Sequence, residues 1–422
     1  MDADRGWNDV LRPPLQGAAA AVLLALLAGV LSGHAGVFRY TLTHDAQDFG
    51  VFLASARHDL AGRSLYSRQP RASATGRRTA PLNLNLPHTM ALLRPLARLG
   101  DGAALLTWMA LGLALGLAAS VASIAALGWR LRPLPALLVA LYLVAWAPSA
   151  AVTSTAQITF YVTAPVVAGW LAFRRRRPVA AGAWIGLAAA IKPFLLIFLP
   201  YFLVRRDYRA LAAMLAVVGA VIGIGLAMYG PGAYAEWLGQ LPDVTWSAHF
   251  LNASLLGLLQ RLIGRSGHAT LATAPGLVAP LCAALALAVG VATLWAVRRP
   301  ARHSRQVDGD WAAVLLASLL MSPLGWSYYL WIAVWPVAAV IAAARPWRRA
   351  RPADAWLVPG LAGWLWWGAM TEWGQPHPLA TLTAASLYFW SLLSLWIWTL
   401  GAIRRDARVA VDNGPRRADT GP

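Results

Sequence analysis

The chain has 422 residues, of which 59% are hydrophobic and only 13% are charged. A soluble domain usually carries about 25% charged residues, and the mean hydropathy of +0.54 also argues against a soluble protein. The composition therefore predicts an all-α polytopic membrane protein. The single cysteine, Cys282, excludes a disulfide framework and a cysteine-based metal site. We expect neither a metal nor a cofactor.

The net charge of +19 comes from 36 basic and 17 acidic residues. Basic residues collect at the cytoplasmic ends of membrane spans and meet anionic lipid headgroups. Membrane lipids therefore explain the charge better than a nucleic-acid partner, for which the sequence has no aromatic-basic signature.

A helix needs about 20 apolar residues to cross a bilayer, and fewer if it stops inside it. The apolar segments predict about twelve transmembrane or broken helices, at 16–33, 102–128, 134–147, 156–173, 178–191, 193–204, 210–229, 276–297, 311–322, 326–344, 355–371 and 379–402. Both termini are then cytoplasmic in a multi-pass cell-membrane protein.

Two of these predictions depend on helix breaks. The stretches 178–204 and 311–344 each lie between two basic clusters, so a single span would leave one cluster outside. Pro193 and Pro323 lie near their midpoints, and proline interrupts a helix. Each stretch is therefore predicted to be two short helices that turn back.

The domain organisation follows from these spans. Residues 1–403 are predicted to form one integral membrane domain, and residues 404–422 a disordered cytoplasmic tail. A large outer loop at about 34–101 contains apolar patterns that are too short to cross the membrane, so we expect it to bear surface helices.

The outer loop contains two carboxylates, Asp45 and Asp48, three residues apart. Such a pair shares one face of a helix or turn. It could bind a metal, or one member could act as a general base. Ordinary helix capping by an exposed aspartate is the alternative.

Several basic and polar side chains could bind an anionic substrate. The outer loop carries Arg63 among nine arginines. Arginine holds phosphate in a forked geometry, but these side chains could also simply touch lipid headgroups. Lys192 is the only lysine and lies in an apolar segment, where a cation usually lines a cavity or meets a partner. Snorkelling to the membrane surface is the alternative. Gln157 and His249 lie near predicted outer span ends, where they could be ordinary interfacial residues.

Four features in order resemble glycosyltransferase family 87, whose members have the type C glycosyltransferase fold. They are the acidic-aromatic loop Asp48-Phe49-Gly50-Val51-Phe52 followed by Leu60 to Tyr66, Gln157 at the fourth span, Ala181-Gly182 with Lys192-Pro193, and Ser322-Pro323 with Trp326. The resemblance extends over about residues 16–345. One departure is that Ser327-Tyr328-Tyr329 follow Trp326, where the family often has histidine.

The resemblance implies transfer of a hexose, most often mannose, from a polyprenyl-phosphate-linked donor to a lipid or glycan acceptor on the outer membrane face. It implies inversion at the anomeric carbon and no nucleotide sugar. Asp48 matches the expected general base. We expect Lys192 and Arg63 to bind the donor phosphate, and Asp45, Gln157, His249 and Tyr328 to contact substrate.

A secondary transporter or lipid flippase is the alternative function, because broken helices and a buried lysine also suit one. The sequence shows no internal repeat, and the large structured outer loop argues against a transporter.

Overall fold

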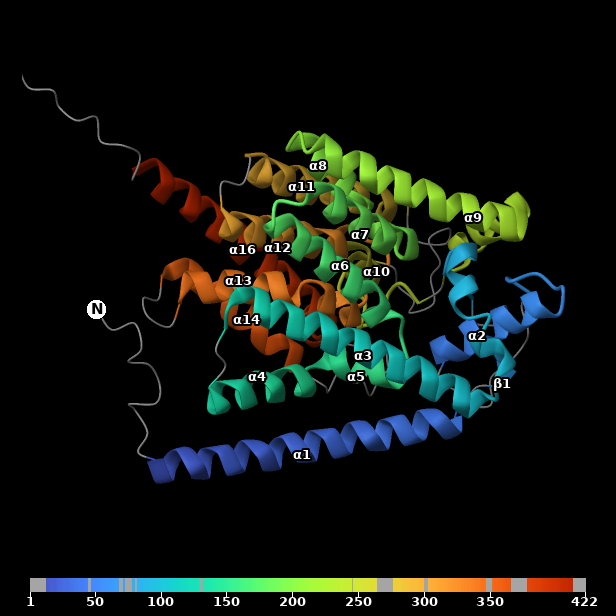
Figure 1. The fold of residues 1–422 in the computed structure, drawn as a ribbon, viewed down its shortest axis with the longest axis horizontal. Helices are drawn as coiled ribbons and strands as arrows, with labels where there is room; N and C mark the ends of the chain where they lie inside the picture. Colours follow the sequence, from blue (N-terminus) through green and yellow to red (C-terminus); the bar gives the residue numbers. More distant parts are fainter. Residues whose placement is uncertain are drawn as a thin grey trace, which may run out of the picture.

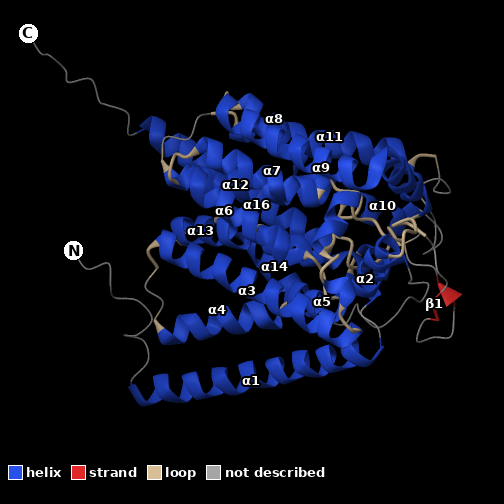
Figure 2. Ribbon diagram, turned by 45° about the vertical axis from the view of Figure 1, so that its right-hand side comes forward, coloured by secondary structure: helices blue, strands red, loops and turns tan. Residues whose placement is uncertain are grey.

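The computed structural model describes residues 13–44, 47–67, 71–72, 78–79, 82–129, 132–244, 246–263, 276–299, 303–346, 351–365 and 378–412. These residues form a helical bundle with a small antiparallel hairpin of β1 (Arg71–Ala72) and β2 (Arg78–Thr79) at one end (Figures 1 and 2).

The first half of the bundle consists of α1 (Pro13–His44), α2 (Gln47–Leu60), α3 (Asp101–Leu127), α4 (Pro133–Ala145), α5 (Ala147–Thr155), α6 (Thr159–Arg174), α7 (Pro178–Ile191) and α8 (Phe198–Val204). The second half consists of α9 (Tyr208–Gln240), α10 (Leu255–Ile263), α11 (Val278–Val297), α12 (Ser304–Met321), α13 (Val334–Ala344), α14 (Leu357–Ala362), α15 (Pro378–Leu382) and α16 (Leu387–Asp412).

Short 3-10 helices connect or extend these elements. They are η2 (Pro87–Leu92), η3 (Leu96–Arg98), η4 (Pro193–Ile197), η5 (Leu241–Asp243), η6 (Ser327–Ile332), η7 (Pro352–Trp356), η8 (Gly363–Leu365) and η10 (Ala384–Ser386).

Several helices are suited to a membrane. Within the described ranges, five are long and apolar enough to cross it, at Gln16–Thr41, Asp101–Leu127, Tyr208–Asp243, Val278–Val297 and Ala384–Asp406, and six if the bent pair α4 and α5 is one span. The all-helical, multi-pass prediction is therefore confirmed, whereas the count of about twelve spans stays a prediction. The helices α7, α13 and η4 with α8 are apolar but shorter, as expected of broken spans.

Both expected helix breaks are present. α7 ends at Ile191, and Lys192 has an extended backbone (φ −134°, ψ 101°) before Pro193 opens η4. Ser322 is also extended (φ −62°, ψ 135°) after the end of α12. Proline at the following position explains both, because it disfavours the helical region for the residue before it.

Three helices continue further than the apolar pattern indicates. α1 runs to His44 and α9 to Gln240, so the segments predicted to be outer loops begin about ten residues later than expected. α9 bends at Gly230, whose positive φ of 71° suits a residue without a Cβ. α16 runs to Asp412, so the first part of the predicted disordered tail is helical.

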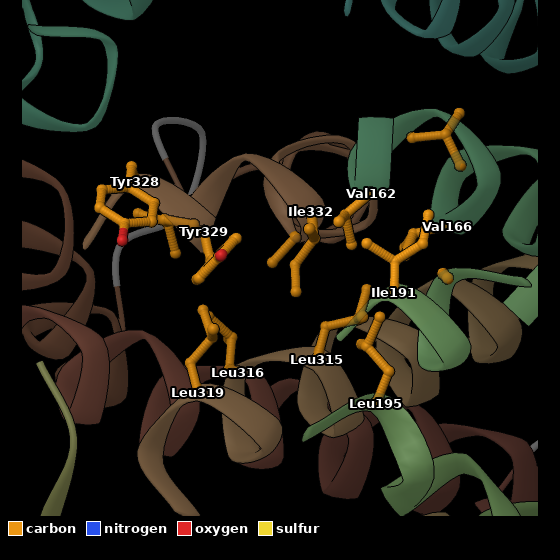
Figure 3. Packing of buried hydrophobic residues seen from close by; sticks show 14 of the residues in the cluster. Val162, Val166, Ile191, Leu195, Leu315, Leu316, Leu319, Tyr328, Tyr329 and Ile332 are labelled. Atoms are coloured by element: carbon orange, nitrogen blue, oxygen red, sulfur yellow. The ribbon is translucent and has the colours of Figure 1, made fainter. Parts of the chain in front are cut away.

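The core is centred on α12, in which residues 307–320 are all buried. This helix contacts α6, α11, α13 and α16. Figure 3 shows Leu315 of α12 beside Ile191 and Leu195, and Leu316 and Leu319 of the same helix on the side of Tyr329, with Tyr328 at the end of this packing. The apolar core therefore continues directly into the segment where the chain breaks at Ser322.

Close helix packing fixes α7 against α9. A Cβ on Gly182 would lie 2.0 Å from the backbone oxygen of Ala210, and one on Gly186 would lie 2.8 Å from that of Met214. Small residues allow such approach between membrane helices. The glycine of the Ala181-Gly182 motif thus serves packing, and it fixes the helix that ends at Lys192.

The two ends of the bundle differ. The first turns of α1 and the last turns of α16 lie at one end, whereas α2, the β hairpin and the last turns of α9 lie at the other (Figure 1). The end that carries the hairpin and α2 is called the α2 end below.

Buried ion pairs connect helices away from the α2 end. Arg174 contacts Asp308, and Arg205 contacts Asp310. Trp170 also donates its indole N–H to Asp308 Oδ1 at 3.0 Å. The Arg205 side chain is only 3% exposed, so removing it would leave a buried carboxylate without its partner.

Replacing Arg205 should therefore destabilise the fold. We expect Arg205→Met to lower the free energy of unfolding by about 3–5 kcal/mol, because breaking a buried pair leaves one uncompensated charge. The adjacent Arg206 is exposed and has φ of 60°, so Arg206→Gly should be neutral or stabilising by about 1 kcal/mol. Unfolding of the purified protein in detergent measures both. Equal losses in the two variants would contradict this assignment.

Candidate active site

Asp48 lies in the first turn of α2, at the α2 end of the bundle. Phe49 and Phe52, which follow it, are 2% and 6% exposed and belong to the main core. Phe49 packs on Trp108 of α3 with ring centroids 5.8 Å apart. The aromatic residues after Asp48 therefore anchor the helix start and fix the backbone position of the carboxylate.

Gln157, in the connection between α5 and α6, donates a hydrogen bond from Nε2 to Asp48 Oδ2. The preceding Ala156 has φ of 49°, an unusual backbone conformation for a residue with a Cβ. Its carbonyl accepts a hydrogen bond of 2.9 Å from Trp108 Nε1. Trp108 thus contacts Phe49 and also holds the turn that presents Gln157, which orients Asp48.

Burial raises the pKa of Asp48 above its ordinary value. The hydrogen bond from Gln157 and the positive charge of Lys192 act in the opposite direction and lower it. A carboxylate with a raised pKa is a stronger proton acceptor, which suits a general base. The effect of Lys192 also places its ammonium group within electrostatic range of Asp48.

Lys192 lies at the break after α7. Its Nζ donates a 2.8 Å hydrogen bond to Asn85 Oδ1 and lies 5.5 Å from the ring centroid of Tyr329. The extended backbone at Lys192 removes this residue from the helix and gives the side chain a direction that α7 would not allow. Lys192 thus has a polar partner in Asn85, which the sequence did not indicate, and its role as a phosphate ligand stays a prediction.

Asn85 belongs to a firmly held segment before η2. Its carbonyl accepts a 2.8 Å hydrogen bond from the Tyr66 hydroxyl, and its side-chain amide donates to Asn83 Oδ1 at 3.2 Å. Beside it, Trp237 in the last turns of α9 donates to the Leu84 carbonyl at 3.1 Å. A signal in the sequence was the polar pair Asn83 and Asn85 alternating with leucines, since buried amides require partners.

A row of aromatic rings leads away from Lys192, and it is called the aromatic row below. It consists of Tyr329, Tyr328, Trp326 and His249, whose successive ring centroids lie 4.7, 6.1 and 5.8 Å apart for Tyr329–Tyr328, Tyr328–Trp326 and Trp326–His249. Tyr328 and Tyr329 are within electrostatic range of Asp48. The tyrosines that stand where the family often has histidine therefore line the candidate site.

His249 lies at the far end of the aromatic row. Burial and the charge of Arg261 lower its pKa to about 4, so the ring is neutral at physiological pH. Its Nδ1 accepts a 3.1 Å hydrogen bond from the Leu251 backbone N–H. The proton is then on Nε2, and His249 is placed as a hydrogen-bond donor instead of a base.

The other candidate residues are not part of this arrangement. Arg63 is exposed in the turn after α2, and among the described residues no hydrogen bond or ion pair joins it to Asp48 or Lys192. Asp45 lies outside the described residues. Nor do the described residues contain a group of three His, Cys, Asp or Glu side chains that could hold a metal.

The arrangement combines a carboxylate and an ammonium group at the same set of helix ends. Asp48 can accept a proton, and Lys192 can neutralise a nearby anion. The two act on different parts of one reaction if a hydroxyl group attacks a carbon atom whose leaving group is a phosphate. This is the chemistry of group transfer from a phosphate ester.

Comparison with known proteins agrees with this chemistry. The family model for glycosyltransferase family 87 matches residues 84–324, which include Asn85, Gln157 and Lys192. A polyprenol-phosphate-mannose-dependent alpha-(1-2)-phosphatidylinositol mannoside mannosyltransferase of Mycobacterium tuberculosis is 30% identical over 359 residues, which are 81% of this chain and 80% of the relative. The chain belongs to glycosyltransferase family 87.

A second relative, from Mycolicibacterium smegmatis, has the same description. It is 31% identical over 200 residues, which are 46% of this chain and 43% of the relative. No solved structure matches the chain. The protein is thus a membrane glycosyltransferase, and the resemblance inferred from its motifs is confirmed.

The acid limb of the pH–rate profile should report Asp48. The base is active when it is deprotonated, so turnover rises as the pH rises through its pKa, and the raised pKa places the midpoint above the ordinary aspartate value of about 3.9. Because the Gln157 hydrogen bond lowers this pKa, Gln157→Leu should move the midpoint to higher pH.

Initial rates of the purified enzyme across pH measure this shift. Thr163→Val is a matched control, because Thr163 is also buried near the start of α6 but hydrogen-bonds within its own helix, to the Thr159 carbonyl. A midpoint that stays in place, or moves to lower pH, in Gln157→Leu would show that Gln157 does not act on the catalytic carboxylate.

Proposed function

We propose that the protein transfers mannose from polyprenyl-phosphate mannose to a hydroxyl group of a phosphatidylinositol-mannoside-type lipid on the outer membrane face. Asp48 acts as the general base and Lys192 binds the donor phosphate. The observation that carries the proposal is the placement of Asp48, oriented by Gln157 and within electrostatic range of Lys192, in a chain of glycosyltransferase family 87. The substrates are those named for the two curated relatives.

The reaction follows from the two charges. Asp48 removes the proton of the acceptor hydroxyl as its oxygen forms a bond to the anomeric carbon. The bond between that carbon and the phosphate oxygen breaks, and its electron pair leaves with the polyprenyl phosphate. Lys192 stabilises the additional negative charge on the phosphate, since hydrogen bonds between charged groups are among the strong ones in proteins.

The location of the site suits a donor that is anchored in the bilayer. Lys192 lies between two apolar helices, so its charge is near the membrane interior, where a lipid-linked phosphate can approach it from the side. The first turns of α1 and the last turns of α16 share the end of the bundle opposite α2 (Figure 1). The arrangement supports two cytoplasmic termini and a catalytic end on the outer face.

The transporter or flippase alternative predicts substrate movement without a new glycosidic bond. In that case the Asp48 carboxylate would have no covalent step to assist. The Asp48 variant described next therefore discriminates between the two functions.

Asp48→Asn should lower turnover by about 10²-fold or more, because general-base assistance contributes about 10²–10⁴-fold. Folding should survive, and the stability of the folded protein at neutral pH should be equal or higher. A carboxyl group whose pKa is raised on folding destabilises the folded protein as the pH rises, and an asparagine side chain does not. The measurement is transfer of labelled mannose from polyprenyl-phosphate mannose by purified protein.

Asp59→Asn is the matched control on the same helix, where Asp59 pairs with Arg94 at 2.9 Å. It should retain near-normal turnover, and Asp45→Asn should be milder than Asp48→Asn. Near-normal turnover of Asp48→Asn would disprove the general-base role and favour the transporter.

Lys192→Met should weaken donor binding by about 10–100-fold, as expected for the loss of a hydrogen bond to a charged group worth about 1.5–3 kcal/mol. Its melting temperature should change little, because methionine keeps an unbranched chain in a site that is half-buried.

Arg63→Met tests the second predicted phosphate ligand, and we expect a smaller loss of donor affinity because Arg63 is exposed. Donor affinity measured by isothermal titration distinguishes these outcomes. Unchanged affinity with a lost melting transition would make Lys192 structural.

A further inference from the structure

Arg261, in the last turn of α10, is a cation that the proposed mechanism does not use. Its Nε donates to Ser386 Oγ at 3.0 Å, and Nη1 donates to the His249 and Asn252 carbonyls at 2.9 and 3.0 Å. These partners are all neutral. No carboxylate among the described residues forms an ion pair with Arg261.

The remaining nitrogen of Arg261 is unsatisfied. Nη2 is enclosed by protein and has no hydrogen-bond partner, so two N–H donors of a cation are buried without an acceptor. Burial lowers the pKa of Arg261 to about 9, which still leaves it charged at physiological pH. A buried, unpaired charge is costly, and an anion that docks there would remove that cost.

The surroundings of Arg261 connect it to the candidate active site. The segment of residues 249–252 whose carbonyls it holds also pairs with the segment around Trp326: the Ser327 backbone N–H donates to the Leu251 carbonyl at 2.8 Å, and Asn252 forms a β-bridge with Trp326. His249 itself ends the aromatic row that begins at Tyr329 beside Lys192. Arg261 and Lys192 are thus two cations at opposite ends of one row of rings.

We propose that Arg261 is a second phosphate-binding site of this glycosyltransferase, which takes the phosphate ester of a lipid substrate through the unsatisfied Nη2 donors. Arginine suits this ligand because its guanidinium donates two parallel hydrogen bonds to phosphate oxygens. Arg261 is half-buried as a residue, so part of it reaches the surface.

The phosphate can belong to either lipid, and the choice rests on the proposed function. With Lys192 on the donor phosphate, the acceptor phosphodiester is the natural occupant of the Arg261 site, and the aromatic row between the cations would then line the path of the sugar. If the donor phosphate occupies the Arg261 site, Lys192 has another role. Binding measurements separate the two sources without relying on turnover.

The test measures the affinity of the full chain in detergent for three probes: polyprenyl phosphate, phosphatidylinositol, and octyl mannoside, which has no phosphate. The first variant, Arg261→Gln, removes the charge. The second, Arg261→Lys, keeps the charge but cannot donate two parallel hydrogen bonds to one phosphate. It also serves as the folded variant if Arg261→Gln does not fold. Arg206→Gln, an exposed arginine at the end of α8, is the control.

We expect both Arg261 variants to bind one phosphate lipid about 10-fold or more weakly, with octyl mannoside affinity unchanged. Weakened phosphatidylinositol binding identifies the acceptor phosphate, and weakened polyprenyl phosphate binding identifies the donor phosphate. Unchanged affinity for both lipids in Arg261→Lys, or equal loss for all three probes, would overturn the proposal. Arg261 would then only stabilise the segment of residues 249–252.

Failure of this proposal is distinguishable from failure of the proposed function. Asp48→Asn retains the charge at Arg261, so it should bind both phosphate lipids normally even though it is slow in transfer. A loss of transfer in Asp48→Asn together with unchanged lipid affinity in the Arg261 variants would therefore disprove only the second phosphate site.

Discussion

The charge of Lys192 constrains the structure around it more than any other group. An ammonium group inside an apolar segment is unfavourable unless it faces a polar partner, and here the partners are Asn85 Oδ1, the face of Tyr329 and the charge of Asp48. Each comes from a different part of the chain. The loop before η2, the segment after the Ser322 break and the start of α2 must therefore meet at the point where α7 ends.

This meeting point consists of helix ends. A helix that stops inside a bundle leaves backbone groups without their usual partners, and such irregular backbone is tolerated at membrane depth only where protein or a cavity covers it. The break at Lys192 brings its ammonium group near Tyr329, which follows the break at Ser322, and within electrostatic range of Asp48, which Gln157 holds. The candidate site thus lies where the fold can stabilise charges.

Part of this arrangement is predictable from the sequence. The helix breaks follow from Pro193 and Pro323. The candidate residues Asp48 and Lys192 follow from their unusual positions beside aromatic and apolar residues. The contact between Asp48 and Gln157 joins residues 109 positions apart, and it depends on how Phe49, Trp108 and Ala156 pack. Local patterns contain no such information. Asn85 was missed for the same reason, because its role appears only when Lys192 is beside it.

The helix lengths show a second limit to what the sequence can predict. The apolar pattern ends near Gly33 and Tyr229, whereas α1 and α9 continue to His44 and Gln240. Hydropathy marks where a helix leaves an apolar environment and not where it stops. The last turns of α9 contact the segment that carries Asn85 through Trp237, and the apolar pattern of the sequence therefore does not reveal them. The buried Arg261 was detectable as a cation in an apolar stretch, as Lys192 was.

The most direct test is an experimental structure of the protein in a lipid environment with polyprenyl phosphate bound. We expect a phosphate oxygen within hydrogen-bond distance of Lys192 Nζ, at about 3 Å. It also predicts that the Asp48 carboxylate remains held by Gln157 on the side from which an acceptor would approach. A phosphate bound away from Lys192, or an Asp48 carboxylate turned away from the ligand, would contradict it.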